Sequence, residues 1–347
     1  MQHDVAAPHC VPDQIALYQT DQLPVQEVCR FDPAQAAAAL QAPREVLAID
    51  IGGDKIRRAT YRVGDGTLRK LDEEVLRGAG GAGYLPFLER LAAEATARHL
   101  RVGISSATKM EGSRITRTVN LPVFFAEFGA KYGADYANLF PHQSYVANDT
   151  IMGVCGASTL LALRGIPVRD VGFFICASGM GASVLAGGRA LHVEAGHVPV
   201  VEALNPLGQM TPCGVEGRRF VCVERVAAAR AGIEDHYRRL TGEARDGIAL
   251  GRLYEAGDPL ATALYEASAR ALAHAIAGVT TRYAFAEADT SAVVLHGGNF
   301  EIPRYRAAIR RFLDAMPTAG MRVVFSRDLS ANVCLDGAAI TAVCHGG

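Results

Sequence analysis

The chain has 347 residues, of which half are hydrophobic and a fifth are charged, and its formal net charge of −1 gives no indication of a nucleic-acid or membrane-surface partner. It has no uninterrupted apolar run of about 18 residues and no basic start followed by an apolar stretch, so we expect neither a membrane span nor a secretory signal. The eight cysteines are scattered along the chain, which favours reduced, mostly buried thiols in a cytoplasmic protein over a disulfide framework.

Residues 1–45 are expected to form an N-terminal extension, because their pattern is irregular over most of its length. Within this extension FDPAQAAAAL (31–40) predicts a short helix that Asp32 caps and in which Pro33 occupies the first turn. The segment is too short and too weakly patterned to indicate a helix-turn-helix domain.

The predicted core begins with VLAI (46–49), a short apolar run that is typical of a buried strand and that ends in DIGGDK (50–55). The turn GDG (64–66) then indicates a β-hairpin. Further along, SYVA (144–147) predicts a strand that runs into Asn148 and Asp149.

The same order of elements then begins again. VGFFICA (171–177) predicts a buried strand, SGMGA (178–182) a small-residue turn, and SVLAGGRALH (183–192) a hairpin. Because strand, turn and hairpin occur twice, about 125 residues apart, we predict two domains of one design that face each other across a cleft. The expected boundaries are a small domain over 46–165 and a large domain over 166–347.

The large domain is expected to continue with a long helix over 258–279, which Asp258 caps. SAVVL (291–295) predicts a strand that closes with HGGN, and MRVVF (321–325) predicts the last strand. An Ala-rich helix follows, which we expect could pack back on the small domain.

Three glycine turns at strand ends together favour nucleotide binding. In DIGGDK the paired glycines let backbone N–H groups approach phosphate oxygens, while Asp50 is suited to hydrated Mg²⁺ and Lys55 to a phosphate. SGMG (178–181) is suited to the other side of a triphosphate, and HGGN (296–299) to an adenine or ribose. Taken alone, DIGGDK is equally well explained as an ordinary tight turn, and a plain turn explains each of the other two better. The spacing of a Walker A loop is absent.

Asp149 is the candidate base for phosphoryl transfer, because that reaction needs a carboxylate that orients the acceptor hydroxyl and takes its proton. Asn148 offers a donor and an acceptor to a neighbouring sugar hydroxyl. EAGH (194–197) places the carboxylate of Glu194 near the imidazole of His197, and both groups can bind vicinal hydroxyls of a polyol. A plain Asn-Asp turn and a packed histidine remain open as structural interpretations.

His197, Cys213 and Cys222 form a candidate zinc site, since nitrogen and thiolate ligands are those that zinc prefers. No fourth ligand is evident, so the alternative is two buried thiols beside a substrate-binding histidine.

Taken together, these motifs resemble those of the ROK family, whose members are sugar kinases and repressors with the two-domain, actin-like (ribonuclease H-like) α/β fold. The likeness runs from about Val46 to the C-terminus, and the order of the motifs matches throughout. DIGGDK resembles the DxGGTK phosphate loop, NLP (120–122) the segment leading to the base, and VANDT (146–150) the NDxN stretch. ASGMGAS resembles the second phosphate motif, VEAGH the GExGH sugar-binding motif and VVLHGG the adenosine-side turn.

The resemblance implies an ATP- and Mg²⁺-dependent kinase, expected as a homodimer, that phosphorylates a hydroxyl of a sugar, amino sugar or cyclitol with Asp149 as general base. The ATP-Mg residues it implies are Asp50, Gly52, Gly53, Asp54, Lys55, Ser178, Gly179, Gly181, Gly297 and Gly298. The acceptor residues it implies are Asn148, Glu194, His197, Glu224, Gly112 and Asn120.

The sequence departs from the family pattern at several positions. Asp54 stands in the Thr place of the phosphate loop, where its charge should weaken ATP binding unless Mg²⁺, Arg57 or Arg58 offsets it. Thr211 stands where the first Cys of the zinc motif CxCGxxGCxE belongs, and extra residues precede Cys222. Val193 and Ser183 also replace glycines. These departures indicate a divergent member, whose substrate need not be plain glucose.

Two other functions stay open from the sequence. One is a sugar-responsive transcription regulator, which needs a DNA-binding domain that residues 1–45 do not clearly supply. The other is a catalytically inactive sugar-binding protein in which Asp54 has abolished ATP binding.

Overall fold

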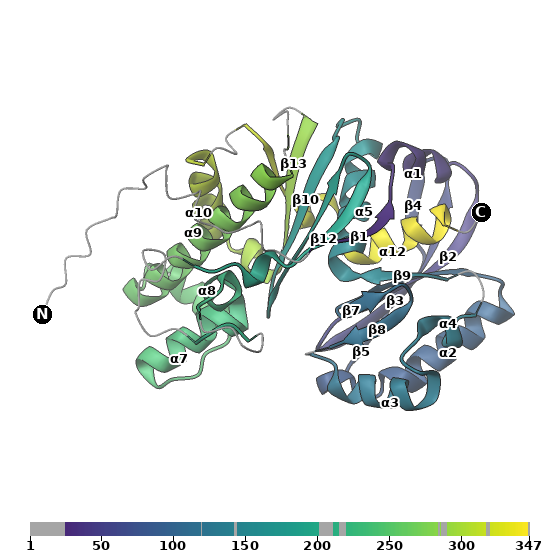
Figure 1. Cartoon of the computed structure of the whole chain (residues 1–347), viewed down its shortest axis with the longest axis horizontal. Coiled ribbons are helices and arrows are strands. Elements are labelled where there is room, and N and C mark those ends of the chain that lie inside the picture. Colours follow the sequence, from purple (N-terminus) through teal and green to yellow (C-terminus); the bar gives the residue numbers. More distant parts are fainter. Residues whose placement is uncertain are drawn as a thin grey trace, which may run out of the picture.

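The computed structural model describes residues 25–118, 120–141, 144–200, 211–214, 220–283, 285, 290–316 and 320–345. Two sheets divide these residues into two lobes (Figure 1). The strands of the first lobe are β2 (Arg44–Ile51), β3 (Lys55–Gly64), β4 (Thr67–Lys70), β5 (Glu74–Arg77), β6 (Arg101–Ser106), β7 (Lys109–Glu111), β8 (Arg114–Arg117) and β9 (Ser144–Asn148). Those of the second are β1 (Val25–Arg30), β10 (Asp170–Cys176), β11 (Met180–Ala186), β12 (Arg189–Val193), β13 (Ser291–His296) and β14 (Arg322–Phe325).

The two sheets repeat one plan. In the first lobe the strand order is β4-β3-β2-β6-β9, with β5 beside β3, and β2, β6 and β9 are parallel. In the second lobe the order is β1-β12-β11-β10-β13-β14, and β10, β13 and β14 are parallel. In each lobe the first strand of the repeat therefore lies in the middle of its sheet, with an antiparallel hairpin on one side and two parallel strands on the other. β7 and β8 form a separate small hairpin.

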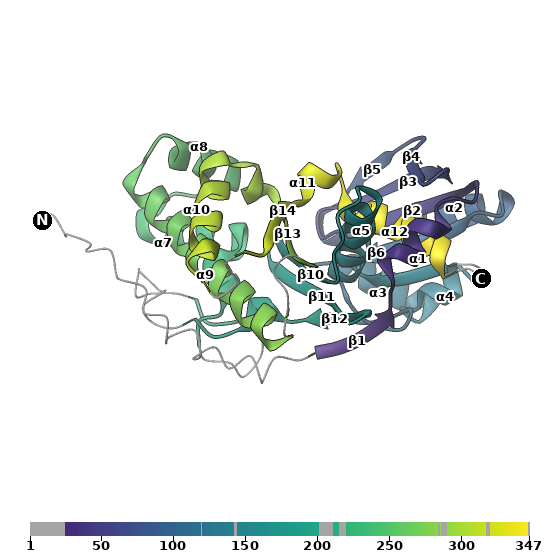
Figure 2. The ribbon, with the colours of Figure 1, turned by 90° about the horizontal axis from the view of Figure 1, so that it is seen from above.

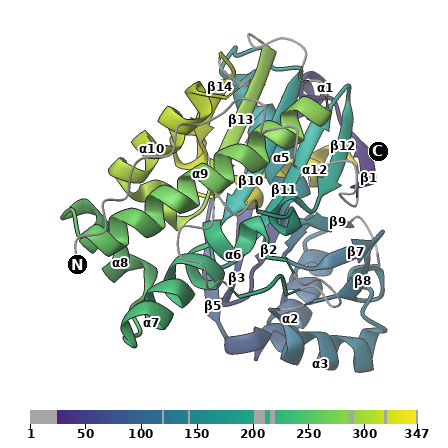
Figure 3. The ribbon, with the colours of Figure 1, turned by 60° about the vertical axis from the view of Figure 1, so that its left-hand side comes forward.

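Helices cover both faces of each sheet. The helices are α1 (Pro33–Ala39), α2 (Tyr84–Ala97), α3 (Pro122–Tyr132), α4 (Tyr136–Leu139), α5 (Asp149–Leu163), α6 (Val223–Ala227), α7 (Asp235–Thr241), α8 (Gly247–Glu255), α9 (Pro259–Arg282), α10 (Pro303–Asp314), α11 (Ser326–Leu329) and α12 (Val333–Cys344). α5 and α12 lie between the two sheets (Figure 1). α9 and α10 cover the outer face of the second-lobe sheet (Figure 3), and α2 and α3 cover that of the first.

The predicted strand at 46–49 is confirmed within β2, and its side chains show why it is apolar throughout. Leu47 and Ile49 join the cluster under α2 and α3, whereas Val46 and Ala48 join the cluster around α5 and α12. Successive side chains on a strand point to opposite faces, so a sheet covered by helices on both faces needs apolar residues at every position.

Glycines allow α12 to lie unusually close to its neighbours in the middle layer. A Cβ atom at Gly337 of α12 would lie 1.9 Å from the carbonyl oxygen of Met152 in α5. A Cβ atom at Gly103 of β6 would lie 1.8 Å from the carbonyl oxygen of Ala338. Because real Cβ atoms do not approach backbone this closely, only glycine fits at both positions. α12 thus packs on β2 and β6 of the first lobe. This packing is the one expected from the sequence for the Ala-rich C-terminal helix.

The described part of the expected N-terminal extension belongs to the fold, so the interpretation of 1–45 as an appendage is wrong for residues 25–45. β1 pairs antiparallel with β12, with Val25 opposite Val193, and so extends the second-lobe sheet by one strand (Figure 2). The helix predicted over 31–40 is confirmed as α1, and Asp32 Oδ1 accepts a hydrogen bond from Ala34 N at 2.8 Å. α1 packs against α5 and α12, so this segment contacts the layer that both lobes share.

Within the described residues, all seven cysteines are free thiols and five of them are buried, as expected from their scatter. Of the helices that the structure describes, none combines the length and the hydrophobicity that crossing a bilayer requires.

Candidate functional site

Asp149 lies at the start of α5, directly after β9, where the strand end and the helix cap fix its position. Asn148 Oδ1 caps the helix by accepting hydrogen bonds from Thr150 N at 2.9 Å and Thr150 Oγ1 at 2.6 Å. Asn148 Nδ2 donates to the carbonyl oxygen of Thr108 at 3.0 Å. The amide of Asn148, predicted to bind a sugar hydroxyl, therefore also holds the residue beside it in place.

The carboxyl group of Asp149 lies in an environment that disfavours its charge. Burial raises the pKa of Asp149 to about 7, and the negative charge of Asp50 adds to this effect, whereas His192 opposes it. A carboxyl with a pKa near neutrality is poised to accept a proton from a hydroxyl, which is the property of a general base.

Asp50 ends β2 and is anchored from two sides. Its Oδ1 accepts from Ser105 Oγ at 2.8 Å, and its Oδ2 accepts from Asn332 Nδ2 at 3.1 Å. Asn332 also caps α12 by accepting from Leu335 N at 3.1 Å. Sequence reasoning missed both partners, although Ser105 is opposite Asp50 in the register of β2 and β6.

The first glycine turn joins β2 to β3 and contains Gly52, Gly53 and Asp54. Gly52 N donates to the carbonyl oxygen of Lys55 at 2.9 Å, which closes the turn. A Cβ atom at Gly53 would lie 2.9 Å from Cβ of Asn120, so the turn packs directly on this predicted acceptor residue. Burial lowers the pKa of Lys55, and the nearby Arg57 and Arg77 lower it further. The turn therefore lies in a region rich in positive charge.

Arg58, one of the groups expected to offset the charge of Asp54, pairs with other residues. It donates to Asp72, between β4 and β5, at 2.7 Å and to Glu74 of β5 at 3.2 Å. Asp54 Oδ2 instead accepts from Arg230 Nη2 of the second lobe at 3.1 Å. Sequence reasoning could not find this contact, because the two residues are far apart in the chain.

The second and third glycine turns meet beside the start of α5. A Cβ atom at Gly181 would lie 2.9 Å from Cγ2 of Thr150, the residue after Asp149. Gly297 has a φ of 139°, and a Cβ atom there would lie 1.9 Å from the carbonyl oxygen of Cys176, at the end of β10. The second turn therefore contacts the start of α5, and the third turn contacts the end of the strand that precedes the second.

Three of the predicted acceptor residues gather at the second turn. His197 Nε2 lies 3.9 Å from Glu194 Oε2, and His197 Nδ1 lies 3.9 Å from Glu224 Oε2. Glu224 Oε1 accepts from Met180 N at 3.0 Å, which anchors this carboxylate to the glycine turn itself.

His192 belongs to the site, although sequence reasoning did not select it. Its Nε2 lies 3.4 Å from Glu194 Oε1, and its Nδ1 lies 3.2 Å from Thr150 Oγ1. The hydrogen bond of His192 lowers the pKa of Glu194 despite burial of that carboxylate. The sequence did contain a signal for His192. Residues two apart along a strand point to the same face, and His192 lies two positions before Glu194, which directly follows β12. Thr150 Oγ1 also bonds Ser183 Oγ at 2.6 Å. Ser183, which replaces a glycine of the family motif, therefore links the second lobe to α5.

The residues predicted to bind zinc are brought together. Ligand atoms of His197, Cys213 and Cys222 all lie within 4.8 Å of one another, and Cys213 Sγ is 3.6 Å from His197 Nδ1. The 3.6 Å separation of Cys213 Sγ and His197 Nδ1 suits a tetrahedral zinc ion, whose ligand bonds are about 2.0–2.3 Å long. Thr211, in the place of the missing cysteine, donates its hydroxyl to Asp235 at 2.8 Å.

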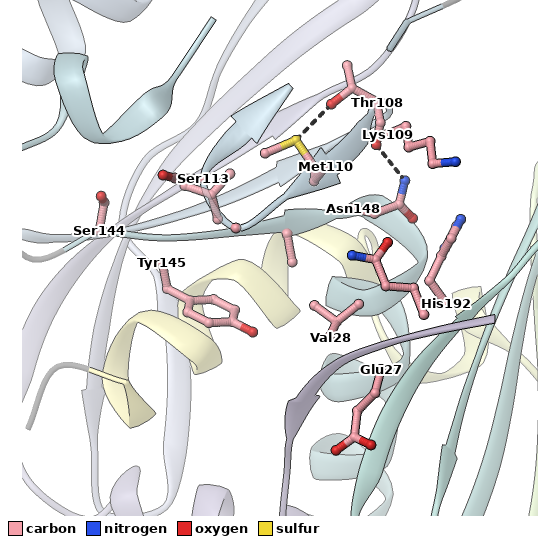
Figure 4. Close-up of a pocket in the computed structure, with 14 residues that line it drawn as sticks. Glu27, Val28, Thr108, Lys109, Met110, Ser113, Ser144, Tyr145, Asn148 and His192 are labelled. Atoms are coloured by element: carbon pink, nitrogen blue, oxygen red, sulfur yellow. Dashed lines mark hydrogen bonds between the residues drawn. The ribbon is translucent and has the colours of Figure 1, made fainter. Parts of the chain in front are cut away.

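A cavity of about 390 Å³ adjoins the site between the edge strands of the two sheets. Met110 of β7, Asn148 at the end of β9 and Val28 of β1 surround it, and His192 faces it from β12 (Figure 4). Gly112, predicted as an acceptor residue, lines this cavity in the turn between β7 and β8, where its φ is 58°. The cavity therefore continues from Asn148 away from the glycine turns, and β1 forms one of its walls.

The comparisons with known proteins agree with this architecture. A model described as ROK family matches residues 165–342, just over half of the chain, whereas no curated protein sequence matches it. The ROK hexokinase from Thermus thermophilus is similar with a TM-score of 0.62 and 24% identity, over 87% of this chain and 98% of that one. A ROK family glucokinase from Streptomyces griseus, solved in complex with glucose and AMPPNP, has a TM-score of 0.59 and 20% identity over 85% and 98%. A ROK family transcriptional regulator, a homolog of the E. coli MLC protein, has a TM-score of 0.59 and 18% identity over 87% and 79%. The predicted two-domain, actin-like α/β fold is confirmed.

Proposed function

This chain belongs to the ROK family, and from that membership we propose that it is a kinase that transfers the γ-phosphate of ATP to a hydroxyl of a sugar, amino sugar or cyclitol. The observation that carries the proposal is the position of Asp149. Its carboxyl group, with a pKa of about 7, starts α5 near Asp50, and the next residue, Thr150, contacts the second glycine turn at Gly181 and bonds His192. This position supports a phosphoryl-transfer site with Asp149 as the base.

In the proposed reaction Asp149 orients the acceptor hydroxyl and takes its proton as the phosphoryl group arrives. Glu194, His197 and Glu224 hold the other acceptor hydroxyls. Lys55 attracts the donor phosphates, and the glycines of the first two turns leave their backbone N–H groups accessible to phosphate oxygens. Approach of the two lobes around both substrates excludes water and so limits ATP hydrolysis.

Asp50 fits the expected magnesium ion, because Ser105 and Asn332 each use one lone pair of its two oxygens and leave the others available. When bound, Mg²⁺ supplies positive charge that offsets the charge of the donor phosphates.

The test of the proposal is ADP release from ATP and Mg²⁺ with a panel of hexoses, amino sugars and cyclitols. We expect acceptor-dependent release with at least one member of the panel. If the panel gives none and ATP fails to raise the melting temperature, the inactive sugar-binding protein becomes the better interpretation. The similarity to a regulator makes repression the second alternative, but the described residues 25–45 form β1 and α1 and supply no DNA-binding domain.

The reaction should depend on pH through Asp149. A protonated carboxyl cannot accept the hydroxyl proton, so kcat/KM for the acceptor should rise with pH and level off above about 7. Below this value it should fall about tenfold per pH unit. Asp50→Asn removes a negative charge near Asp149 and should shift the midpoint to lower pH, even though it also lowers the plateau. A profile that stays flat from pH 5.5 to 8 would count against Asp149 as the base.

We also propose that His197, Cys213 and Cys222 bind zinc, which would fix the ring of His197 for acceptor binding. The purified chain should carry stoichiometric zinc by elemental mass spectrometry, and Cys213→Ser should lose it. Cys344→Ser, which removes a half-buried thiol elsewhere, serves as the control. Thr211→Cys restores the first cysteine of the family motif and should make the zinc harder to remove with a chelator. Zinc-free wild-type protein after expression with added zinc would contradict the assignment.

The free thiols of the described cysteines suit a reducing compartment, in keeping with a cytoplasmic enzyme. The homodimer expected from the family resemblance stays a prediction.

A further inference from the structure

An ion pair connects the first phosphate turn to a segment beside the second phosphate turn, across the lobes. Asp54 lies in the first turn, and its Oδ2 accepts from Arg230 Nη2 at 3.1 Å. Both side chains are well exposed, at 61% and 64% of their surface. The contact thus lies where solvent, and any ligand between the lobes, can reach it.

The backbone around Arg230 is fixed to the second phosphate turn. Ala229 N donates to the carbonyl oxygen of Ala177 at 2.7 Å, and Ala231 N donates to that of Ser178 at 3.3 Å. Arg230 lies between these two residues, at the start of a π-helical turn over Ala229–Glu234. Its backbone is therefore held against the turn proposed to clamp the triphosphate, while its guanidinium extends towards the opposite turn.

The chemistry of the pair favours exchange for a phosphate. An exposed ion pair contributes little stability, because solvent screens its charges, so Asp54 holds Arg230 weakly. A guanidinium binds phosphate through two parallel hydrogen bonds, and a polyphosphate chain carries more charge than one carboxylate. A donor whose phosphates lie between the two turns would offer Arg230 a better partner than Asp54.

We propose that Arg230 binds the phosphate chain of the donor from the second lobe, and that Asp54 is a competitor within the chain that occupies Arg230 when no donor is bound. This inference rests on the proposed kinase function. It explains how the turn accommodates a carboxylate in the Thr place when no donor is bound, because that carboxylate then pairs with Arg230 across the lobes.

The two side chains should then have opposite effects on donor binding. Arg230→Ala removes a charged hydrogen-bond donor and should raise the Kd for AMPPNP about tenfold. Asp54→Thr removes the competitor and should lower that Kd about threefold. In the Asp54→Thr background, Arg230→Ala should cost more than in the wild type, because Arg230 no longer has to leave a partner.

The experiment is calorimetric titration of the full chain with AMPPNP and Mg²⁺ for the wild type, both single variants and the double variant. Arg238→Ala serves as the matched control, because Arg238 is also exposed and pairs with an acidic residue, Asp235, in the same region. The Kd for the acceptor and the melting temperature should stay unchanged in all four proteins.

Equal weakening by both single variants would overturn the inference, since it would show that the pair only holds the lobes together. If the wild type binds AMPPNP and Arg230→Ala leaves the Kd unchanged, the inference is also overturned, while the proposed function stands. Absence of nucleotide binding by the wild type would overturn both.

Discussion

Asp149→Asn is expected to lower kcat by about 10²–10⁴-fold, because asparagine cannot accept the proton of the acceptor hydroxyl. The variant keeps the size of the side chain and an oxygen that can accept from Thr150 N, as Asp149 Oδ1 does at 2.9 Å. Acceptor and AMPPNP affinities should therefore persist, and the loss should appear in kcat rather than in KM. Steady-state ADP release and calorimetry of both ligands give the measurement.

Asp246→Asn provides the matched control for that change. Asp246 caps α8 by accepting from Ala249 N at 2.8 Å, so the substitution again replaces an aspartate at a helix N-terminus. It should leave kcat unchanged. If kcat of Asp149→Asn stays within a few-fold of the wild-type value, Asp149 is not the base.

Gly337→Ala is expected to destabilise the fold by roughly 3 kcal/mol or more, since the new methyl group would meet the carbonyl oxygen of Met152 at 1.9 Å. Neither backbone can move aside easily, because α5 and α12 are both buried between the two sheets. Urea unfolding followed by circular dichroism should show the transition at a lower urea concentration.

Gly129→Ala in α3 is the matched control, since it also replaces a glycine within a helix. A Cβ atom there finds no described atom within 4 Å. The change should stabilise the chain by about 0.5–1 kcal/mol through helix propensity alone. Equal effects of the two substitutions would show that the middle layer is less tightly packed than the structure indicates.

Local patterns predicted the first strand and the hairpin of each sheet, but not β1, β5, β6, β7 or β8. The apolar run at 46–49 indicated a buried strand, and the glycine pairs indicated turns, because these signals depend on neighbours in the sequence. The repetition of strand, turn and hairpin indicated two similar halves, and both sheets place a hairpin on one side of the first strand and two parallel strands on the other.

Contacts between distant segments could not be predicted in this way. Asn332 bonds Asp50 from the other end of the chain, and Arg230 pairs with Asp54 from the other lobe. β1 shows the same limit, since its exposed, mixed sequence carries no strand period and acquires its structure from pairing with β12. Such contacts depend on the tertiary arrangement, which no short window of sequence contains.

The pairing of β1 with β12 also has a consequence for synthesis of the chain on the ribosome. Val25 pairs with Val193, which is made about 170 residues later, or roughly 10–30 s at ordinary translation rates. The first lobe waits still longer, because its sheet packs against α12 near the C-terminus. The first lobe therefore cannot reach its final packing until α12 has been made, after every strand of the second lobe. Until then the first-lobe sheet lacks the helix that covers one of its faces, and that is the period in which a chaperone would matter most.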